Sequence, residues 1–153
     1  MTNNFTVTTV ILIRHGERDD PNPAHPNPNP HLNGAGKARA QTLVHVLGRS
    51  GIKAIYTSHF IRTQETARPL ALHLGLLPTE IDEAQDIKND LLSKHVGEPV
   101  LVVGHTDTVP DLIKQLGGGN VEILDQEFDN LYVVAFFNPG QASLAKLKYG
   151  HPS

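Results

Sequence analysis

The sequence predicts an α/β fold in which strands alternate with helices and most strands of the central sheet run parallel. Two apolar runs, at residues 10–13 and 100–103, lack the polar alternation of a half-exposed strand, which is typical of strands buried on both faces. Segments with the helical spacing of apolar residues separate such runs. Two strand-like segments, at 131–137 and 143–148, lie close together near the end of the chain and indicate at least one antiparallel strand.

The first half of the chain contains two predicted strands and two predicted helices. Asn33 stands where the first helix needs an N-cap, and Gly75 stands where the second helix must stop. Pro69 falls inside the second helical pattern, so we expect a kink or a break there. In order, the elements are a strand at 6–13, a helix at 34–49, a strand at 54–57 and a helix from about 61 to 74.

The second half continues the alternation and ends in strands. Gly117 and the two glycines after it stop the last helix, and residues 138–140 (Asn-Pro-Gly) are predicted to turn the chain between the final strands. We see no internal repeat and expect one domain over residues 1–153. In order, the elements are a short strand at 79–81, a helix at 85–95, a strand at 99–104, a helix from about 109 to 116, and strands at 131–137 and 143–148.

The segment from residue 19 to residue 31 holds five prolines in thirteen residues. Proline removes backbone donors and restricts φ, so this segment is neither a helix nor a central strand. The favoured interpretation is a solvated polyproline-like loop in which His25 and His31 are exposed. The alternative is a flap over a ligand site, because the segment leaves directly from the end of the first strand.

Composition excludes several classes of function. The chain has no cysteine, so disulfides, thiolate metal sites and cysteine nucleophiles are absent. Its formal net charge is -3, which argues against general nucleic-acid binding. The polar start of the chain and the short apolar run after it resemble neither a signal peptide nor a membrane span, so we expect a cytoplasmic protein without a membrane partner.

Polar side chains gather at three predicted strand-to-helix junctions, at residues 14–18, 57–66 and 104–108. Open α/β sheets bind ligands at the carboxyl ends of their strands, so these junctions are expected to face one crevice. Together they supply at least two arginines and two histidines, which suits a phosphate because the guanidinium fork matches phosphate oxygens. A neutral imidazole can attack phosphorus, and a glycine after it lets the backbone approach a ligand closely.

The residues at these junctions resemble the motifs of the histidine phosphatase superfamily, which includes the cofactor-dependent phosphoglycerate mutases. Arg14-His15-Gly16 resembles the first motif, residues 57–67 resemble the second, and Val103-Gly104-His105 resembles the third. Residues 32–40 are similar to the helix start of that family. The resemblance implies a phosphoglycerate mutase-like three-layer sandwich with helices on both faces of the sheet.

The same resemblance implies a metal-independent phosphatase that needs no cofactor and works through a covalent phosphohistidine. His15 would be the nucleophile, Arg14 and Arg62 would hold the phosphate, and His105 would be the second histidine that contacts it. Gly16 and Glu17, which follow His15 directly, are further candidates for the phosphate site. The substrate would be a phosphorylated small molecule or a phosphoprotein, and small family members of this length include bacterial phosphohistidine phosphatases.

The general acid is left open by the sequence. The family places a glutamate between the second and third motifs, or an aspartate directly after the second histidine. Here Asp107 lies one place further on, and Glu83 is one of four acidic residues in the first of these segments, with Glu80, Asp82 and Asp86. We rank Asp107 slightly ahead of Glu83, with Glu17 third. A phosphohistidine substrate would need no acid.

Structural interpretations compete with each assignment. His15 alone could be a buried structural histidine, Arg62 could pair with Glu65 on the helix surface, and His105 could cap the next helix. The other histidines lack paired ligand spacing, so we expect no metal site, although His105 and Asp107 could join His15 at one.

Three other functions were weighed against the phosphatase. A mutase is the first, but mutases of this family are longer. A phosphate-binding or interaction module without turnover is the second, because no acid is obvious. A metal-dependent hydrolase is the third and ranks lowest. The final strands could pair with another copy of the chain at an edge of the sheet, but nothing in the sequence requires it.

Overall fold

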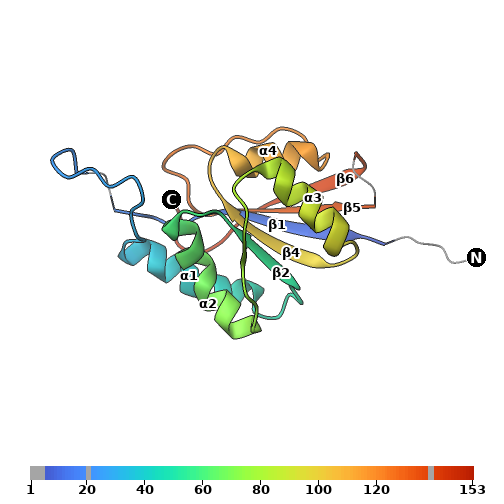
Figure 1. Ribbon diagram of the computed structural model, residues 1–153, viewed down its shortest axis with the longest axis horizontal. Helices are drawn as coiled ribbons and strands as arrows, with labels where there is room; N and C mark the ends of the chain where they lie inside the picture. The colour runs from blue at the N-terminus through green and yellow to red at the C-terminus, as the bar shows by residue number, and fades with distance from the viewer. Residues whose placement is uncertain (1–5, 20–21, 138–139) are drawn as a thin grey trace, which may run out of the picture.

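The computed structural model describes residues 6–19, 22–137 and 140–153, and its described strands form one six-stranded sheet (Figure 1). The strand order is β3-β2-β4-β1-β5-β6. The strands β3, β2, β4 and β1 run parallel to one another. The strand β5 pairs antiparallel with both β1 and β6. The strands are β1 (Thr8–Arg14), β2 (Ala54–Thr57), β3 (Thr79–Glu80), β4 (Pro99–Gly104), β5 (Asn130–Phe136) and β6 (Ala142–Lys148).

Four helices cover the sheet in two pairs, α1 beside α2 and α3 beside α4 (Figure 1). Side chains of β1 alternate between the two pairs: Val10 and Leu12 pack in the core under α3 and α4, and Ile11 and Ile13 pack in the core under α1 and α2. The strand therefore has no solvent face, as its unbroken apolar run predicts. The helices are α1 (Gly34–Leu47), α2 (Ile61–Leu74), α3 (Ala84–Lys94) and α4 (Thr108–Gln115).

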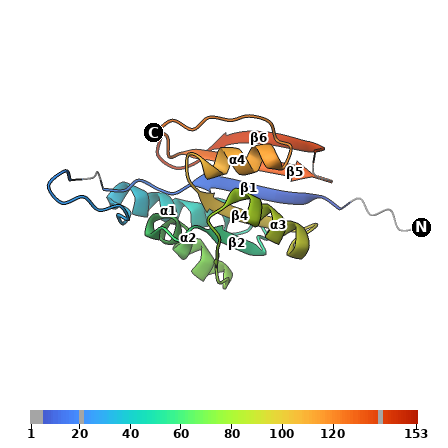
Figure 2. The same ribbon diagram turned by 45° about the horizontal axis from the view of Figure 1, so that its top comes forward.

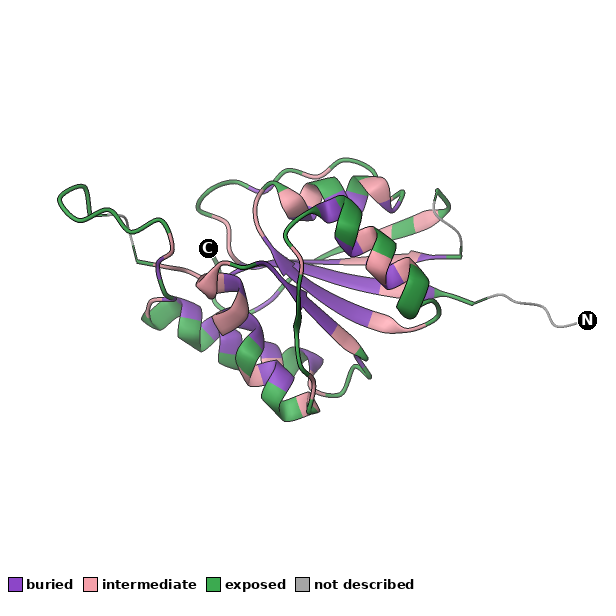
Figure 3. Cartoon of the chain, in the orientation of Figure 1, coloured by how far each residue is buried: buried purple, intermediate pink, exposed green. Residues whose placement is uncertain are grey.

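The three-layer α/β architecture predicted from the sequence is confirmed. The central strands form the buried layer of the molecule (Figure 3), and the antiparallel strands β5 and β6 lie at one edge beside β1 (Figure 2). Asn33 caps α1 by accepting a hydrogen bond from the Gly36 amide at 3.0 Å. Gly75 ends α2 with a φ of 68°, the left-handed conformation that glycine adopts most readily.

The predicted break at Pro69 is wrong, because α2 runs through this residue as one helix. A proline inside a helix removes one backbone hydrogen bond and costs about 3 kcal/mol. Ala67 and Leu70 are fully buried on either side of it, and Ala71 is nearly so. Packing of this face against the sheet offsets the local cost, since tertiary contacts supply most of the stability of a helix in a protein.

The proline-rich segment is exposed from residue 22 to residue 28 and extends away from the sheet (Figures 1 and 2). Its second half is tied to α2, because the Asn29 side chain accepts a hydrogen bond from the Ile61 amide and the Leu32 amide donates to Glu65. His25 and His31 are exposed, as predicted. The expected turn at residues 138–140 lies partly outside the described residues. No helix among those described is long and apolar enough to cross a membrane.

Candidate active site

The three predicted junctions meet because β2, β4 and β1 are adjacent and parallel, so their carboxyl ends share one edge of the sheet. A hydrogen bond of 2.9 Å from the His15 amide to the Gly104 carbonyl joins two of these ends directly. An open pocket of about 550 Å³ lies there, large enough for a phosphoryl group and part of its leaving group. Its basic lining residues are Arg14, His15, Arg18, His59, Arg62 and His105, and its acidic lining residues are Asp82, Glu83, Asp107 and Asp125.

The imidazole of His15 is only 3% exposed and is fixed by its own backbone neighbour. Its Nδ1 lies 2.8 Å from the Gly16 carbonyl oxygen, which can only accept, so Nδ1 carries the proton and Nε2 keeps a free lone pair. Burial lowers the pKa of His15 to about 3, helped by the positive charges of Arg14 and Arg62. The ring is therefore neutral and nucleophilic at Nε2 near pH 7.

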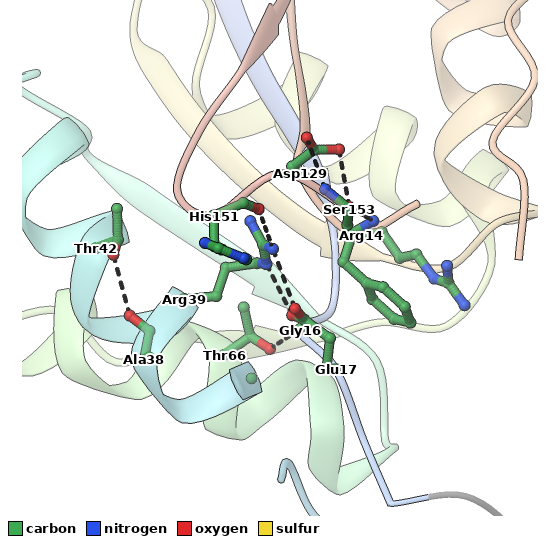
Figure 4. Close-up of polar contacts among 12 residues, drawn as sticks. Arg14, Gly16, Glu17, Ala38, Arg39, Thr42, Thr66, Asp129, His151 and Ser153 are labelled. Atoms are coloured by element: carbon green, nitrogen blue, oxygen red, sulfur yellow. Dashed lines mark hydrogen bonds and ion pairs between the residues drawn. The ribbon is translucent and has the colours of Figure 1, made fainter. Parts of the chain in front are cut away.

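Gly16 serves packing rather than approach to a ligand. Its amide donates to the Thr66 hydroxyl at 2.8 Å (Figure 4), so this donor is already used. A Cβ on Gly16 would lie 3.1 Å from the Gly36 backbone, and a Cβ on Gly36 would overlap the Glu17 carbonyl oxygen. The two glycines let the end of β1 pass closely over the first turn of α1.

Arg14 is 5% exposed and is held by a loop. One terminal nitrogen, Nη1, donates to the carbonyl oxygens of Leu124, Asp125 and Glu127, at 3.3, 2.7 and 2.8 Å. The guanidinium carbon lies 4.0 Å from the centre of the Phe128 ring. The Nε atom is buried without a hydrogen-bond partner among the described residues.

Like Arg14, the pocket residues Arg62 and Arg18 have buried guanidinium nitrogens without a hydrogen-bond partner among the described residues. Within the described part of the chain, Nε and Nη1 of Arg62 and Nε of Arg18 are buried and unpartnered. Burial lowers the pKa of Arg62, and the positive charge of Arg18 lowers it further. Glu65 does not pair with Arg62, because it accepts from the Leu32 amide and faces His31. Three arginines therefore line one pocket, each with at least one buried nitrogen that has no partner among the described residues.

His105 lies next to the candidate nucleophile, with its ring centre 5.3 Å from that of His15. Its Nε2 is 2.8 Å from the Ser58 hydroxyl, and Ser58 is in turn 3.0 Å from the Thr63 hydroxyl. Burial lowers the pKa of His105 to about 4, with the charge of Arg62 as the next cause. His105 is not the cap of α4, because Asp107 is the N-cap residue.

Two of the three acid candidates from the sequence lie at the pocket. Asp107 and Glu83 are exposed members of its lining, and Asp107 accepts a hydrogen bond from the Thr108 amide at 2.8 Å. Glu17 is directed elsewhere: its two carboxylate oxygens accept from Arg39 at 2.8 and 3.1 Å (Figure 4). The structure thus places Glu17 in an ion pair behind the motif that contains His15.

Sequence reasoning missed Arg18, Ser58 and His59 as members of the site. Arg18 belongs to the same predicted junction as Arg14, and Ser58 and His59 open the second junction, so position alone could have singled them out. Which of their atoms face the pocket depends on the tertiary arrangement.

The pocket suits a ligand with several anionic oxygens. Buried polar groups in native proteins nearly always have hydrogen-bond partners, and phosphate oxygens are natural partners for guanidinium groups. Within the described ranges, no three histidine or acidic side chains are grouped so that they could hold a metal ion. The guanidinium nitrogens that lack partners are donors of the kind that oxyanions accept from.

The fold and the pocket together define an α/β protein in which two histidines at strand ends share a pocket with three arginines. The family model for the histidine phosphatase superfamily (branch 1) matches residues 10–86, and the chain belongs to this superfamily. The matched region includes Arg14, His15 and Arg62. His105 lies beyond it and joins the site through the fold.

Solved structures with the same fold include phosphatases. The protein histidine phosphatase SixA, solved as a complex with tungstate, has a TM-score of 0.73 and 18% sequence identity, covering 92% of this chain and 96% of that one. Mycobacterial glucosyl-3-phosphoglycerate phosphatase has a TM-score of 0.68 and 14% identity, covering 94% and 98%. A second structure of the latter, in complex with VO3, has a TM-score of 0.66 and 13% identity, covering 90% and 96%. A search of curated proteins finds no match.

Proposed function

We propose that this protein is a metal-independent phosphatase that forms a covalent phosphohistidine at His15. The observation that carries the proposal is the state of the His15 ring: Nδ1 is fixed as a donor to the Gly16 carbonyl, and the ring is neutral because burial holds its pKa at about 3. The nucleophilic lone pair on Nε2 is therefore available in a pocket that also contains unpartnered guanidinium nitrogens.

The proposed reaction has two steps. In the first, His15 Nε2 attacks phosphorus, the bond from phosphorus to the leaving group breaks, and its electron pair departs with the leaving group. In the second, water attacks the phosphohistidine, the phosphorus–nitrogen bond breaks, and inorganic phosphate is released. Arg14, Arg18 and Arg62 stabilise the charge on the non-bridging oxygens in both steps, where positioning and electrostatics dominate catalysis.

His105 completes the phosphate site in this proposal. Its ring stands beside that of His15, and its hydrogen bond with Ser58 fixes its orientation. Asp107 and Glu83 belong to the proposed site as carboxylates at the rim of the pocket.

The proposed substrate is a phosphomonoester or a phosphohistidine, carried by a small molecule or a phosphoprotein. The complexes of two neighbours with tungstate and VO3 support an oxyanion in this pocket. The names of these neighbours, a protein histidine phosphatase and a sugar-acid phosphatase, support both substrate classes. The open pocket accommodates either leaving group.

The test is hydrolysis of p-nitrophenyl phosphate in excess chelator by the wild type and by His15→Ala. We expect activity that survives the chelator and falls at least about 10³-fold in the variant, because the variant has no nucleophile. Rapid quenching with radiolabelled substrate should trap an acid-labile phosphoenzyme in the wild type only. His45→Ala, which removes an exposed histidine on α1, is the matched control and should remain fully active.

Two results would contradict the proposal. One is substantial activity in His15→Ala, and the other is activity that the chelator abolishes and a divalent metal restores. Binding of phosphate without any turnover would support the interpretation as a non-catalytic module instead.

A further inference from the structure

A histidine–aspartate pair lies on the pocket lining, outside the set of residues that hold the phosphate. His59 follows β2, and Asp82 lies between β3 and α3. Oδ1 of Asp82 accepts two hydrogen bonds from His59, one from the backbone amide at 2.8 Å and one from ring Nδ1 at 2.9 Å. One carboxylate oxygen therefore fixes both the backbone and the ring of His59, and the second ring nitrogen, Nε2, is left for another partner.

The ring of His59 belongs to the pocket lining and is connected by ring contacts to the two histidines of the phosphate site. Its centre lies 4.0 Å from that of Phe60, Phe60 lies 5.2 Å from His105, and His105 lies 5.3 Å from His15. Successive ring contacts thus connect the partly exposed His59 with the buried His15 along the pocket lining. A leaving group departs on the side of phosphorus opposite to the attacking atom, away from His15 and toward the open part of the pocket.

The ion pair between His59 and Asp82 contributes little to the stability of the fold. The side chains of His59 and Asp82 are 52% and 48% exposed, and ion pairs at such exposure contribute about 0–1 kcal/mol to stability. Histidine is also the residue type that most readily exchanges a proton near neutral pH. A pocket that must protonate a leaving oxygen can therefore use an imidazole whose ring is oriented by a carboxylate, as Asp82 orients His59.

We propose that His59 is the proton donor to the leaving group in phosphomonoester hydrolysis, and that Asp82 is a positioning residue that orients it. This inference rests on the proposed function. In the first step, His15 Nε2 bonds to phosphorus, the bond from phosphorus to the ester oxygen breaks, and that oxygen takes the proton from His59 Nε2. In the second step, neutral His59 removes a proton from the attacking water, the phosphorus–nitrogen bond breaks with its pair returning to His15, and His59 is again protonated.

The experiment measures kcat/KM over a series of phosphate monoesters whose leaving groups range from dinitrophenol to phenol and an alkyl alcohol. Protonation is needed most for the poorest leaving groups, and general acid catalysis contributes roughly 10²–10⁴-fold. We expect His59→Gln to lose about 10²-fold on the phenyl and alkyl esters and less than about 3-fold on the dinitrophenyl ester. The plot of log kcat/KM against leaving-group pKa therefore becomes steeper in the variant.

Asp82→Asn provides the second variant. For the poor leaving groups, the wild-type rate should fall at high pH as the imidazolium is lost. In Asp82→Asn this fall in rate should begin at a lower pH, because the imidazolium loses its negative partner. In His59→Gln the fall should be absent. The other titratable and charged groups of the pocket lining, Arg14, His15, Arg18, Arg62, Glu83, His105, Asp107 and Asp125, are unchanged in both variants.

Matched controls separate this role from others. His31 and Glu65 form another exposed histidine–carboxylate pair, 3.2 Å apart and outside the pocket lining, so His31→Gln should leave the slope of the plot unchanged. Asp107→Asn and Glu83→Gln test the carboxylates at the rim. A steeper slope in either of these, with none in His59→Gln, would transfer the acid role to that residue and overturn the inference.

Failure of this inference is distinct from failure of the proposed function. An unchanged slope in His59→Gln, with phosphoenzyme still formed at His15, would reject His59 as the acid and leave the phosphatase in place. Wild-type protein that forms no phosphoenzyme from any ester in the series would reject both.

Discussion

Two arginines on neighbouring helices, the buried Arg39 on α1 and the half-buried Arg62 on α2, carry the same charge but differ in their hydrogen-bond partners. Arg39 is 3% exposed, and it donates to the Glu17 carboxylate and the His151 carbonyl oxygen (Figure 4). It also donates to the Tyr149 carbonyl oxygen. Arg62 has two buried nitrogens without a partner among the described residues, and the nearest charges that act on it are positive.

The pKa values express the same difference. Burial by itself lowers the pKa of Arg39, but the hydrogen bonds and negative charge of Glu17 outweigh it and the pKa is raised. Burial lowers the pKa of Arg62, and Arg18 adds to the effect. A buried cation with satisfied donors holds elements of the fold together, whereas one with unsatisfied donors is a binding site that costs stability until an anion arrives. The two arginines therefore differ in whether their donors are satisfied within the described residues.

The largest expected effect is on stability, at Arg39. Arg39→Ala leaves the Glu17 carboxylate and two carbonyl oxygens without partners, and breaking a buried pair in this way costs about 3–5 kcal/mol. Urea unfolding of the variant should show this loss in the free energy of unfolding. The double variant Arg39→Met with Glu17→Gln should recover part of it, because no buried charge is left alone. Wild-type stability in Arg39→Ala would contradict the structural role.

The next effect is on catalysis, at Arg62. Arg62→Ala removes charge stabilisation from the transferring phosphoryl group, which is worth about 3–4 kcal/mol, or roughly 10²–10³-fold in rate. Its unfolding free energy without ligand should equal or exceed the wild-type value, because repulsion from Arg18 is relieved.

Anion binding gives an independent readout of the same variant. Phosphate at 100 times its dissociation constant should stabilise the wild type by about 2.7 kcal/mol, and the same concentration should stabilise Arg62→Ala much less. Equal stabilisation of both proteins by phosphate would show that the unpartnered nitrogens are not the binding site.

The smallest effect is the dependence of stability on pH. The pKa of His15 falls from 6.5 to about 3 on folding, so between these values the unfolded chain binds more protons than the folded one. Stability is therefore lost as the pH falls below 6.5, by roughly 2–3 kcal/mol from this group between pH 7 and pH 4.5. His15→Ala should lose less stability over this interval in chemical denaturation. A dependence as steep as that of the wild type would show that His15 is not held neutral by the fold.

The order and type of the elements could be predicted from local patterns. The bounds predicted for β2 and β4 are those observed, because a short apolar run between turn residues is compatible with few secondary structures other than a strand. Asn33 and Gly75 marked helix ends correctly because capping depends on neighbours in sequence. A break at Pro69 was wrong because the helix continues where its flanking residues pack strongly, which no local pattern contains.

The candidate site could be predicted in its outline but not in its contacts. His15, Arg14, Arg62 and His105 were selected from motifs at strand ends, and the structure brings them to one pocket because parallel neighbours share an edge. Glu17 follows His15 directly in sequence, yet its carboxylate binds Arg39, which is twenty-two residues away.

The sequence by itself determined the α/β class, the strand ends that carry polar residues, and the candidate nucleophile, because periodicity and junction motifs are local. The tertiary structure alone decided which arginine donors are satisfied, which nitrogen of His15 is free, and that His59 meets Asp82. Hydrogen bonding, burial and charge depend on groups far apart in the chain, and only folding determines which of them become neighbours.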